Sequence, residues 1–365
     1  MKAVKLKTEY LKNPLGIDIK NPRFMWNCEG GKAQSAYRLI ASDTRGNIIW
    51  DSGKVESSQM SFIPYPLDTT SRLRVNWKVK LWDENGLEGE WSEPAFFEIG
   101  LRNASDWSAK WITGNYNVNR KQRYPVDCFK KEFECKKPIL SARLYMTACG
   151  LYSAEINGVD FSMPLAPGIT EYRKRIQYQT YDVTALLHEG ENELLIALGD
   201  GWHRSTGGVD GDRDLFGDTL GVLFQLEVDG QAVCVSDCTM QATQCGPIRQ
   251  NDMQQGEVYD ARLEGELTGW HGVRAYRDDL PILGMNTVPI LEHEAFPGKL
   301  LQTPNGETVL DFGQNIAGYV EMALTARAGQ KVKLTCGEVL DENGNFTQEN
   351  FQDRARHKEC GTAQM

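Results

Sequence analysis

A polar loop near the middle of the chain, Leu198–Asp218, holds residue types that could bind a metal ion or a sugar. Its sequence, LGDGWHRSTGGVDGDRDLFGD, places Asp200, Trp202, His203 and Arg204 within five residues. A sugar site needs an aromatic platform beside carboxylate or guanidinium groups, so these four are candidate substrate-binding residues. The alternative is that Trp202 caps a core while Asp200 and Arg204 hold the loop by hydrogen bonds.

The aspartates of the same loop partly match a calcium-binding loop. Four of them occupy positions 1, 3, 5 and 9 of the pattern: Asp210, Asp212, Asp214 and Asp218. Position 6 is Leu215 where glycine is expected, and position 12 is Gly221 where a bidentate glutamate is expected. The helix–loop–helix form is therefore excluded. The aspartates stay candidates for calcium in another geometry, with a solvated loop as the alternative, and we expect no other cofactor.

A second polar group lies in the segment GEVYDAR, residues 256–262. Its candidate substrate-binding residues are Glu257, Tyr259, Asp260 and Arg262. They could border a pocket supplied mainly by another domain. The alternative is an ion pair between Arg262 and one of the carboxylates, which would fix a domain interface.

Composition excludes several classes of protein. The 365 residues include 40 basic and 50 acidic ones, with no long block of either sign, so nucleic acid is not an expected partner. The opening MKAVKLKTEYLKNP has no apolar run of signal-peptide length, and no segment reaches the ~18 apolar residues of a membrane span. We expect a cytoplasmic protein that has no membrane partner and keeps its nine cysteines as reduced thiols.

Short runs in which apolar and polar residues alternate, separated by turn residues, predict β-strands. These strands would position the two polar segments. The runs are AYRLIAS, LRVNWKVKLWD, ARLYMTACG, YSAEING, NELLIALG, VLFQLEV, YVEMALTA and KVKLTCGEV. Pairs such as Asn157-Gly158 and Asp229-Gly230 favour hairpins between them. An all-β protein built from tandem sandwiches follows.

Two boundaries divide the chain into three expected domains. Residues 1–102 make one small sandwich, residues 103–285 make a larger one, and residues 286–365 begin a third. The third has too few residues for a sandwich, which needs about 100. We therefore expect the chain to be the front part of a longer protein.

Motifs in a fixed order along nearly the whole chain resemble the N-terminal half of bacterial α-L-rhamnosidases, inverting glycosidases with an (α/α)6 catalytic barrel. The matching segments include YLKNPLGIDIKNPRFMWN (10–27), DWSAKWI (106–112), APGITEYRKRIQYQTYDVTALL (166–187), LGDGW (198–202), GEVYDAR (256–262) and DFGQNIAGYVEMAL (311–324). The resemblance implies a fibronectin-III-like sandwich, then a jelly roll, then the start of a third sandwich. Some relatives carry a calcium-assisted rhamnose-binding module of the jelly-roll type.

The resemblance also implies what this chain lacks. In that family the general acid and the general base lie in the barrel, so no catalytic residue is assigned here, and the chain alone is expected to be inactive. Rhamnose-containing glycosides and the C-terminal catalytic domain are the expected partners. The rival hypothesis is a stand-alone, lectin-like carbohydrate-binding protein.

Overall fold

The computed structural model describes residues 1–118, 122–136, 138–207, 213–277 and 281–349, and the backbone of residues 359–364. Within these ranges the regular structure is almost all β, which confirms the predicted fold class. Helices there are single turns: η1 (Ala104–Asp106), η2 (Thr184–Leu186), α1 (Gly201–Arg204) and η3 (Ala261–Leu263). None of the helices in this part of the chain is long and apolar enough to cross a membrane.

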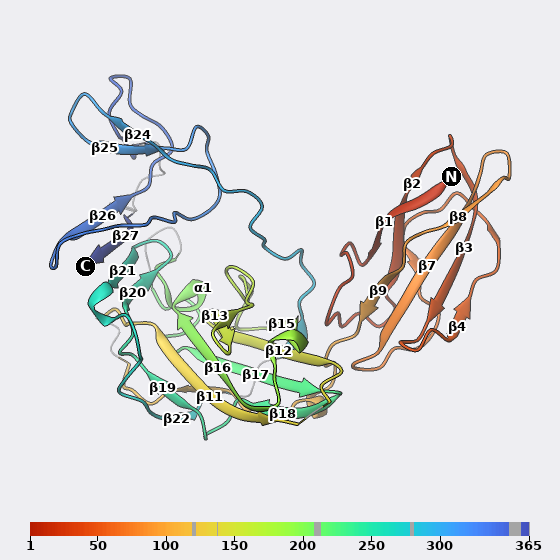
Figure 1. Ribbon diagram of the computed structural model, residues 1–365, viewed down its shortest axis with the longest axis horizontal. Coiled ribbons are helices and arrows are strands. Elements are labelled where there is room, and N and C mark those ends of the chain that lie inside the picture. Colours follow the sequence, from red (N-terminus) through yellow and green to blue (C-terminus); the bar gives the residue numbers. More distant parts are fainter. Residues whose placement is uncertain (119–121, 137, 208–212, 278–280, 350–358, 365) are drawn as a thin grey trace.

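The first sandwich packs a three-stranded sheet against a larger one (Figure 1). The small sheet has the order β1-β2-β6: β1 (Lys2–Thr8), β2 (Arg23–Glu29) and β6 (Ile63–Pro64). The large sheet has the order β4-β3-β7-β8, with β5 on β3 and β9 on β7: β3 (Gln34–Ser42), β4 (Ile48–Asp51), β5 (Val55–Glu56), β7 (Arg74–Asp83), β8 (Glu88–Trp91) and β9 (Ala95–Glu98). Alternate residues of β7 point inward, so Trp77 and Leu81 join Phe24 and Phe97 in the core.

The second sandwich is one rolled sheet that encloses its own core. The order is β14-β13-β16-β11-β19-β22-β10-β17-β12-β15-β23, with β18 on β17. Its strands are β10 (Ile112–Gly114), β11 (Asp127–Cys135), β12 (Ala142–Cys149), β13 (Leu151–Ile156), β14 (Val159–Asp160), β15 (Ile176–Asp182), β16 (Gly190–Gly199), β17 (Gly221–Val228), β18 (Gln231–Val235), β19 (Gln241–Thr243), β22 (His271–Ala275) and β23 (Ile282–Gly284). Apolar residues from both halves of the roll, such as Phe129, Ile196 and Phe224, share one cluster.

The remaining strands lie beyond the roll, toward the C-terminus (Figure 1). A hairpin of β20 (Ile248–Asp252) and β21 (Gly256–Asp260) leaves the second sandwich, and β21 pairs in parallel with β27 (Glu359–Gln364). β26 (Lys331–Thr335) pairs with β27, and β24 (Lys299–Gln302) with β25 (Thr308–Asp311).

Buried charges join the first two sandwiches. The Arg143 guanidinium donates to both carboxylate oxygens of Glu98 at 2.7 and 3.0 Å, and the Arg72 guanidinium donates to both carboxylate oxygens of Glu227 at 2.7 and 2.6 Å. All eight residues of β12 and all eight of β17 are buried, although these strands alternate in sequence. One face of each packs in the core and the other lies beneath the first sandwich and the connecting segment.

Two expectations differ from the structure. The segment YVEMALTA (319–326) alternates like a strand but is irregular, because no strand of the described residues pairs with it and alternation alone leaves its backbone groups unpaired. Cys336 is disulfide-bonded rather than reduced. It follows β26, whose pairing with β27 joins segments distant in sequence. Among the side chains that the structure describes, the free cysteines are Cys28, Cys128, Cys135, Cys149, Cys234, Cys238 and Cys245.

Candidate functional site

The loop that follows β16 turns its polar residues into the second sandwich. Asp200, His203 and Arg204 expose only 1%, 0% and 1% of their surface. Trp202 is half-buried and packs on a small cluster that includes Tyr172. The polar edge expected beside a sugar is thus enclosed by protein, and of the four side chains only the indole of Trp202 keeps part of its surface exposed.

Asp200 is the first centre of a buried ion network. It accepts a hydrogen bond of 2.8 Å from Arg204 Nε and one of 3.1 Å from an Arg213 guanidinium nitrogen. Burial raises the pKa of Asp200, and the two guanidinium groups oppose that rise. A buried carboxylate with two cationic partners is satisfied where it stands, so this arrangement positions the loop.

Asp252 is the second centre, and it connects the loop to the β20–β21 hairpin. Its carboxylate accepts from the backbone N and the hydroxyl of Thr206, both at 2.9 Å, and from Arg123 at 2.5 Å. Burial alone would raise its pKa, but hydrogen bonds led by that of the Thr206 backbone hold the pKa of Asp252 below its usual value. Asn251 accepts from the Asp200 backbone N at 2.6 Å. The hairpin and the loop therefore form one polar unit.

Asp127, at the start of β11, extends the same cluster. It accepts hydrogen bonds from the Tyr116 hydroxyl and, at 2.7 Å, from the amide of Gln244. Burial raises the pKa of Asp127 to about 6, against the attraction of Arg204. Like Asp252, Asp127 belongs to this cluster, and neither was singled out from the sequence because their partners lie far away along the chain.

His203 is buried without a hydrogen-bond partner for either ring nitrogen within the described part of the chain. Its ring packs edge-on against Tyr172, with 5.2 Å between ring centroids. Burial lowers the pKa of His203 to about 4. The imidazole is therefore neutral near pH 7 and acts as a packing group.

Only two of the four candidate calcium ligands lie within the described residues. Asp210 and Asp212 lie outside those residues. Asp214 and Asp218 are half-buried, and Asp214 has a φ of 60°. The described ranges contain no group of three or more His, Cys, Asp or Glu side chains that could hold a metal ion.

The GEVYDAR residues divide between an ion pair and a hollow. Asp260 and Arg262 form a bidentate pair of 2.8 and 2.6 Å, and Asp260 also caps η3 by accepting from the Arg262 backbone N. The Tyr259 hydroxyl donates to Glu264 at 2.8 Å. Burial, with help from Glu264, raises the pKa of Tyr259 to about 12, and desolvation raises the pKa of Glu257.

Glu257 and Tyr259 line a hollow of about 1130 Å³ between β21 and residues 301–346. Most other lining groups come from β25, β26 and the irregular segment after β25. The hollow has a mixed polar and apolar lining, and several of its apolar side chains are exposed: Ile316, Tyr319, Val320, Val339 and Leu340. Glu257 and Tyr259, both predicted from the sequence as site residues, line this hollow together.

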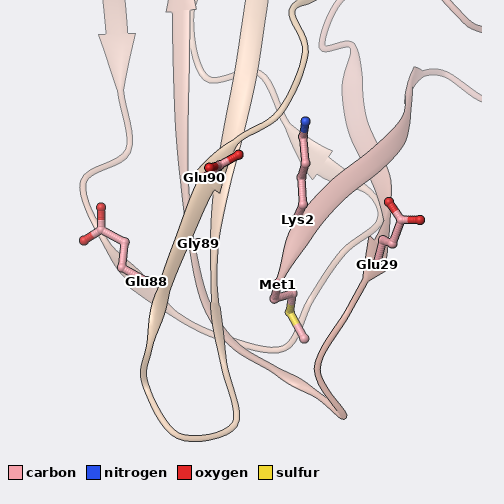
Figure 2. A pocket seen from close by; sticks show the side chains of 6 residues that line it. All are labelled: Met1, Lys2, Glu29, Glu88, Gly89 and Glu90. Atoms are coloured by element: carbon pink, nitrogen blue, oxygen red, sulfur yellow. The ribbon is translucent and has the colours of Figure 1, made fainter.

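A smaller hollow of about 460 Å³ lies at the edge of the first sandwich (Figure 2). Its lining includes Lys2, Glu29, Glu88 and Glu90. Figure 2 shows Glu29 and Glu88 on opposite sides of it, and Lys2 pairs with Glu93 at 3.5 Å. Because these charges do not converge, we assign no site there.

Three families match the chain in succession. Residues 3–103 match the Rha78A-like N-terminal immunoglobulin domain, residues 137–295 match the alpha-L-rhamnosidase N-terminal domain, and residues 301–360 match the bacterial alpha-L-rhamnosidase concanavalin-like domain. Together they follow the order of the sheets described above.

Whole proteins and solved structures agree with these matches. An alpha-L-rhamnosidase of Formosa agariphila is 33% identical over 94% of this chain and 40% of its own length. The structure of the Aspergillus terreus enzyme superposes with a TM-score of 0.88 at 29% identity, over all of this chain and 44% of that one. The Streptomyces avermitilis alpha-L-rhamnosidase, complexed with L-rhamnose, gives 0.87 at 24% identity and shares the fold over 53% of its chain. The chain spans 40–52% of the curated relatives it matches.

Proposed function

This chain belongs to the α-L-rhamnosidase family, whose N-terminal portion it matches, and from that premise we propose that it is the non-catalytic front of an enzyme that hydrolyses terminal α-L-rhamnose from glycosides with inversion. The observation that carries the proposal is the ordered run of three family matches over a chain that spans 40% of a relative 33% identical to it. Its substrates are rhamnose-containing glycosides or oligosaccharides. The cytoplasmic location expected from the sequence stays a prediction.

The proposed domain boundaries follow the sheets. Residues 1–102 form the immunoglobulin-like sandwich, residues 103–285 the jelly roll and residues 286–365 the start of a third sandwich. The separate strand sets and the separate apolar clusters of the first two regions support this division.

The second sandwich serves as a brace. Its ion network of Asp200, Arg204 and Asp252 holds the β20–β21 hairpin, and the hairpin presents Glu257 and Tyr259 to the hollow. A rigid support of this kind would keep a neighbouring catalytic domain in position. A sugar contact at this loop would use the exposed part of Trp202.

The hollow supports the second expected partner, the C-terminal part of the enzyme. Exposed apolar groups such as Tyr319 (68%) and Val339 (52%) are costly on a finished surface. Further strands of the third sandwich and the barrel behind it would cover them. Inverting hydrolysis itself needs two carboxyl groups about 6.5–9.5 Å apart across a sugar-sized pocket, which we place in that C-terminal part.

One assay tests the proposal. The protein extended by the downstream coding sequence should release rhamnose, with inversion, from an aryl α-L-rhamnoside, whereas residues 1–365 alone should release none. Failure of the extended protein to cleave the rhamnoside contradicts the proposal. Loss of rhamnose binding by Trp202→Ala, measured by calorimetry with and without calcium, would assign a sugar contact to the loop.

A further inference from the structure

A tight turn in the first sandwich places two residues other than glycine in the left-handed region of backbone conformation. Thr8 and Leu11 exchange backbone hydrogen bonds of 2.9 and 3.0 Å across Glu9 and Tyr10. Both central residues have positive φ, 51° and 69°. Such a turn usually contains Asn–Gly, because a Cβ crowds the backbone in the left-handed region. The Glu9–Tyr10 turn is therefore strained.

Tyr10 meets a second strained aromatic residue. Phe62 has a φ of 59°, and the two rings pack edge to face with centroids 5.8 Å apart and planes at 71°. The guanidinium carbon of Arg23 lies 5.0 Å from the centroid of Phe62 and 5.9 Å from that of Tyr10. We call these three side chains the Tyr10–Phe62 clamp.

Burial accounts for the strain at Glu9 but not at the two rings. The Glu9 side chain is 4% exposed and accepts three hydrogen bonds from Arg23, through the backbone N at 2.7 Å, Nε at 2.9 Å and a terminal nitrogen at 2.7 Å. In contrast, Tyr10 is 52% exposed and Phe62 is 43% exposed. A strained backbone that holds two aromatic rings in water is typical of a binding surface.

The chemistry of the clamp selects its ligand. Glu9 neutralises Arg23, so the clamp offers no net charge to an anion. Two rings present far less than the ~800 Å² per partner of a specific protein interface. A single sugar fits, since it combines an apolar face for the rings with hydroxyls that accept from the remaining Arg23 donors.

Building on the proposed function, we infer that the Tyr10–Phe62 clamp binds a neutral deoxyhexose residue of the glycoside. It lies in the first sandwich, on a different domain from the Trp202 loop. Bound there, the glycan would be tethered to the front of the enzyme without entering any reaction step.

The test measures the binding of L-rhamnose to residues 1–365 by saturation-transfer NMR at millimolar sugar. Tyr10→Gly should weaken binding at least fivefold while keeping or raising the unfolding temperature, because glycine adopts the left-handed conformation without strain. Phe62→Gly should behave in the same way. Leu87→Ala, at a residue 69% exposed in the same sandwich, is the control and should bind as the parent does.

Equal rhamnose affinity in the parent, Tyr10→Gly and Phe62→Gly would overturn the inference, as would binding lost only in Trp202→Ala. Competition by polygalacturonate would also count against it, because it would mean that the site takes charged glycans. The hydrolysis assay is separate and uses the extended parent, with the aryl rhamnoside as its substrate. Failure of the extended parent to cleave it would sink the proposed function and leave the binding result to decide the clamp.

Discussion

His203 and Asp127 are buried in the same end of the second sandwich, and acid acts on them in opposite directions. The folded pKa of His203 is about 4, below its ordinary 6.5, so acidification from pH 6.5 to 4 protonates the unfolded chain first and removes stability. The folded pKa of Asp127 is about 6, above its ordinary 3.8, so acidification from pH 6 to 4 protonates the folded chain first and adds stability. The two effects largely cancel.

Replacing His203 should reveal the stabilising effect of Asp127 protonation, which His203 offsets in the parent. In His203→Gln the free energy of unfolding should rise by about 3 kcal/mol relative to the parent between pH 6.5 and pH 4, because each pKa unit corresponds to about 1.4 kcal/mol. Urea unfolding at four pH values across this range measures it.

Asp127→Asn is the matched comparison and should shift the profile the other way, with a steeper loss of stability on acidification. Parallel pH profiles for the parent and both variants would contradict the assignment of these two groups.

At the scale of elements, the carboxylate of Asp252 joins the β20–β21 hairpin to the loop of Thr206. Asp252→Asn removes the charge that Arg123 and Arg213 face. Hydrogen bonds to charged groups contribute about 2 kcal/mol, so amides of the hairpin should exchange with deuterium roughly 30-fold faster through local opening. Hydrogen-exchange mass spectrometry of residues 248–260 gives the readout.

Asp260→Asn is the control, because its pair with Arg262 is on the surface and joins residues only two apart. Exchange in the hairpin should stay at the parental rate. Equal acceleration in both variants would mean that Asp252 has no special role as a link.

The sequence predicts the strands more readily than the arrangement of the candidate site. Alternation located strands such as 142–149 and 221–228, but it could not show that both faces of each are buried, since the covering sandwich lies up to 155 residues away along the chain, at Arg72 and Glu227. It also predicted a strand at 319–326, where pairing partners, not pattern, decide the outcome.

The candidate site shows the same limit. The spacing of Asp200 and Arg204 allows the ion pair that forms between them. No local signal joins Asp252 to Arg123, 129 residues away. A mixture of aromatic and charged residues reads equally well as a sugar site or as a buried brace until the fold decides which side chains are enclosed.

At the scale of the whole molecule, the pair of Glu98 and Arg143 decides whether the first two sandwiches unfold together. Arg143 is 9% exposed and Glu98 is 5% exposed. Breaking a buried pair by removing one partner costs about 3–5 kcal/mol, because the remaining charge stays buried and unpaired. Glu98→Gln should therefore lower the unfolding temperature of the chain and separate one calorimetric transition for residues 1–285 into two. Asp51→Asn, which removes the exposed partner of Arg38, should leave the transition single. A single, unshifted transition in Glu98→Gln would mean that the Arg72–Glu227 pair and the apolar contacts hold the two sandwiches together without the Glu98–Arg143 pair.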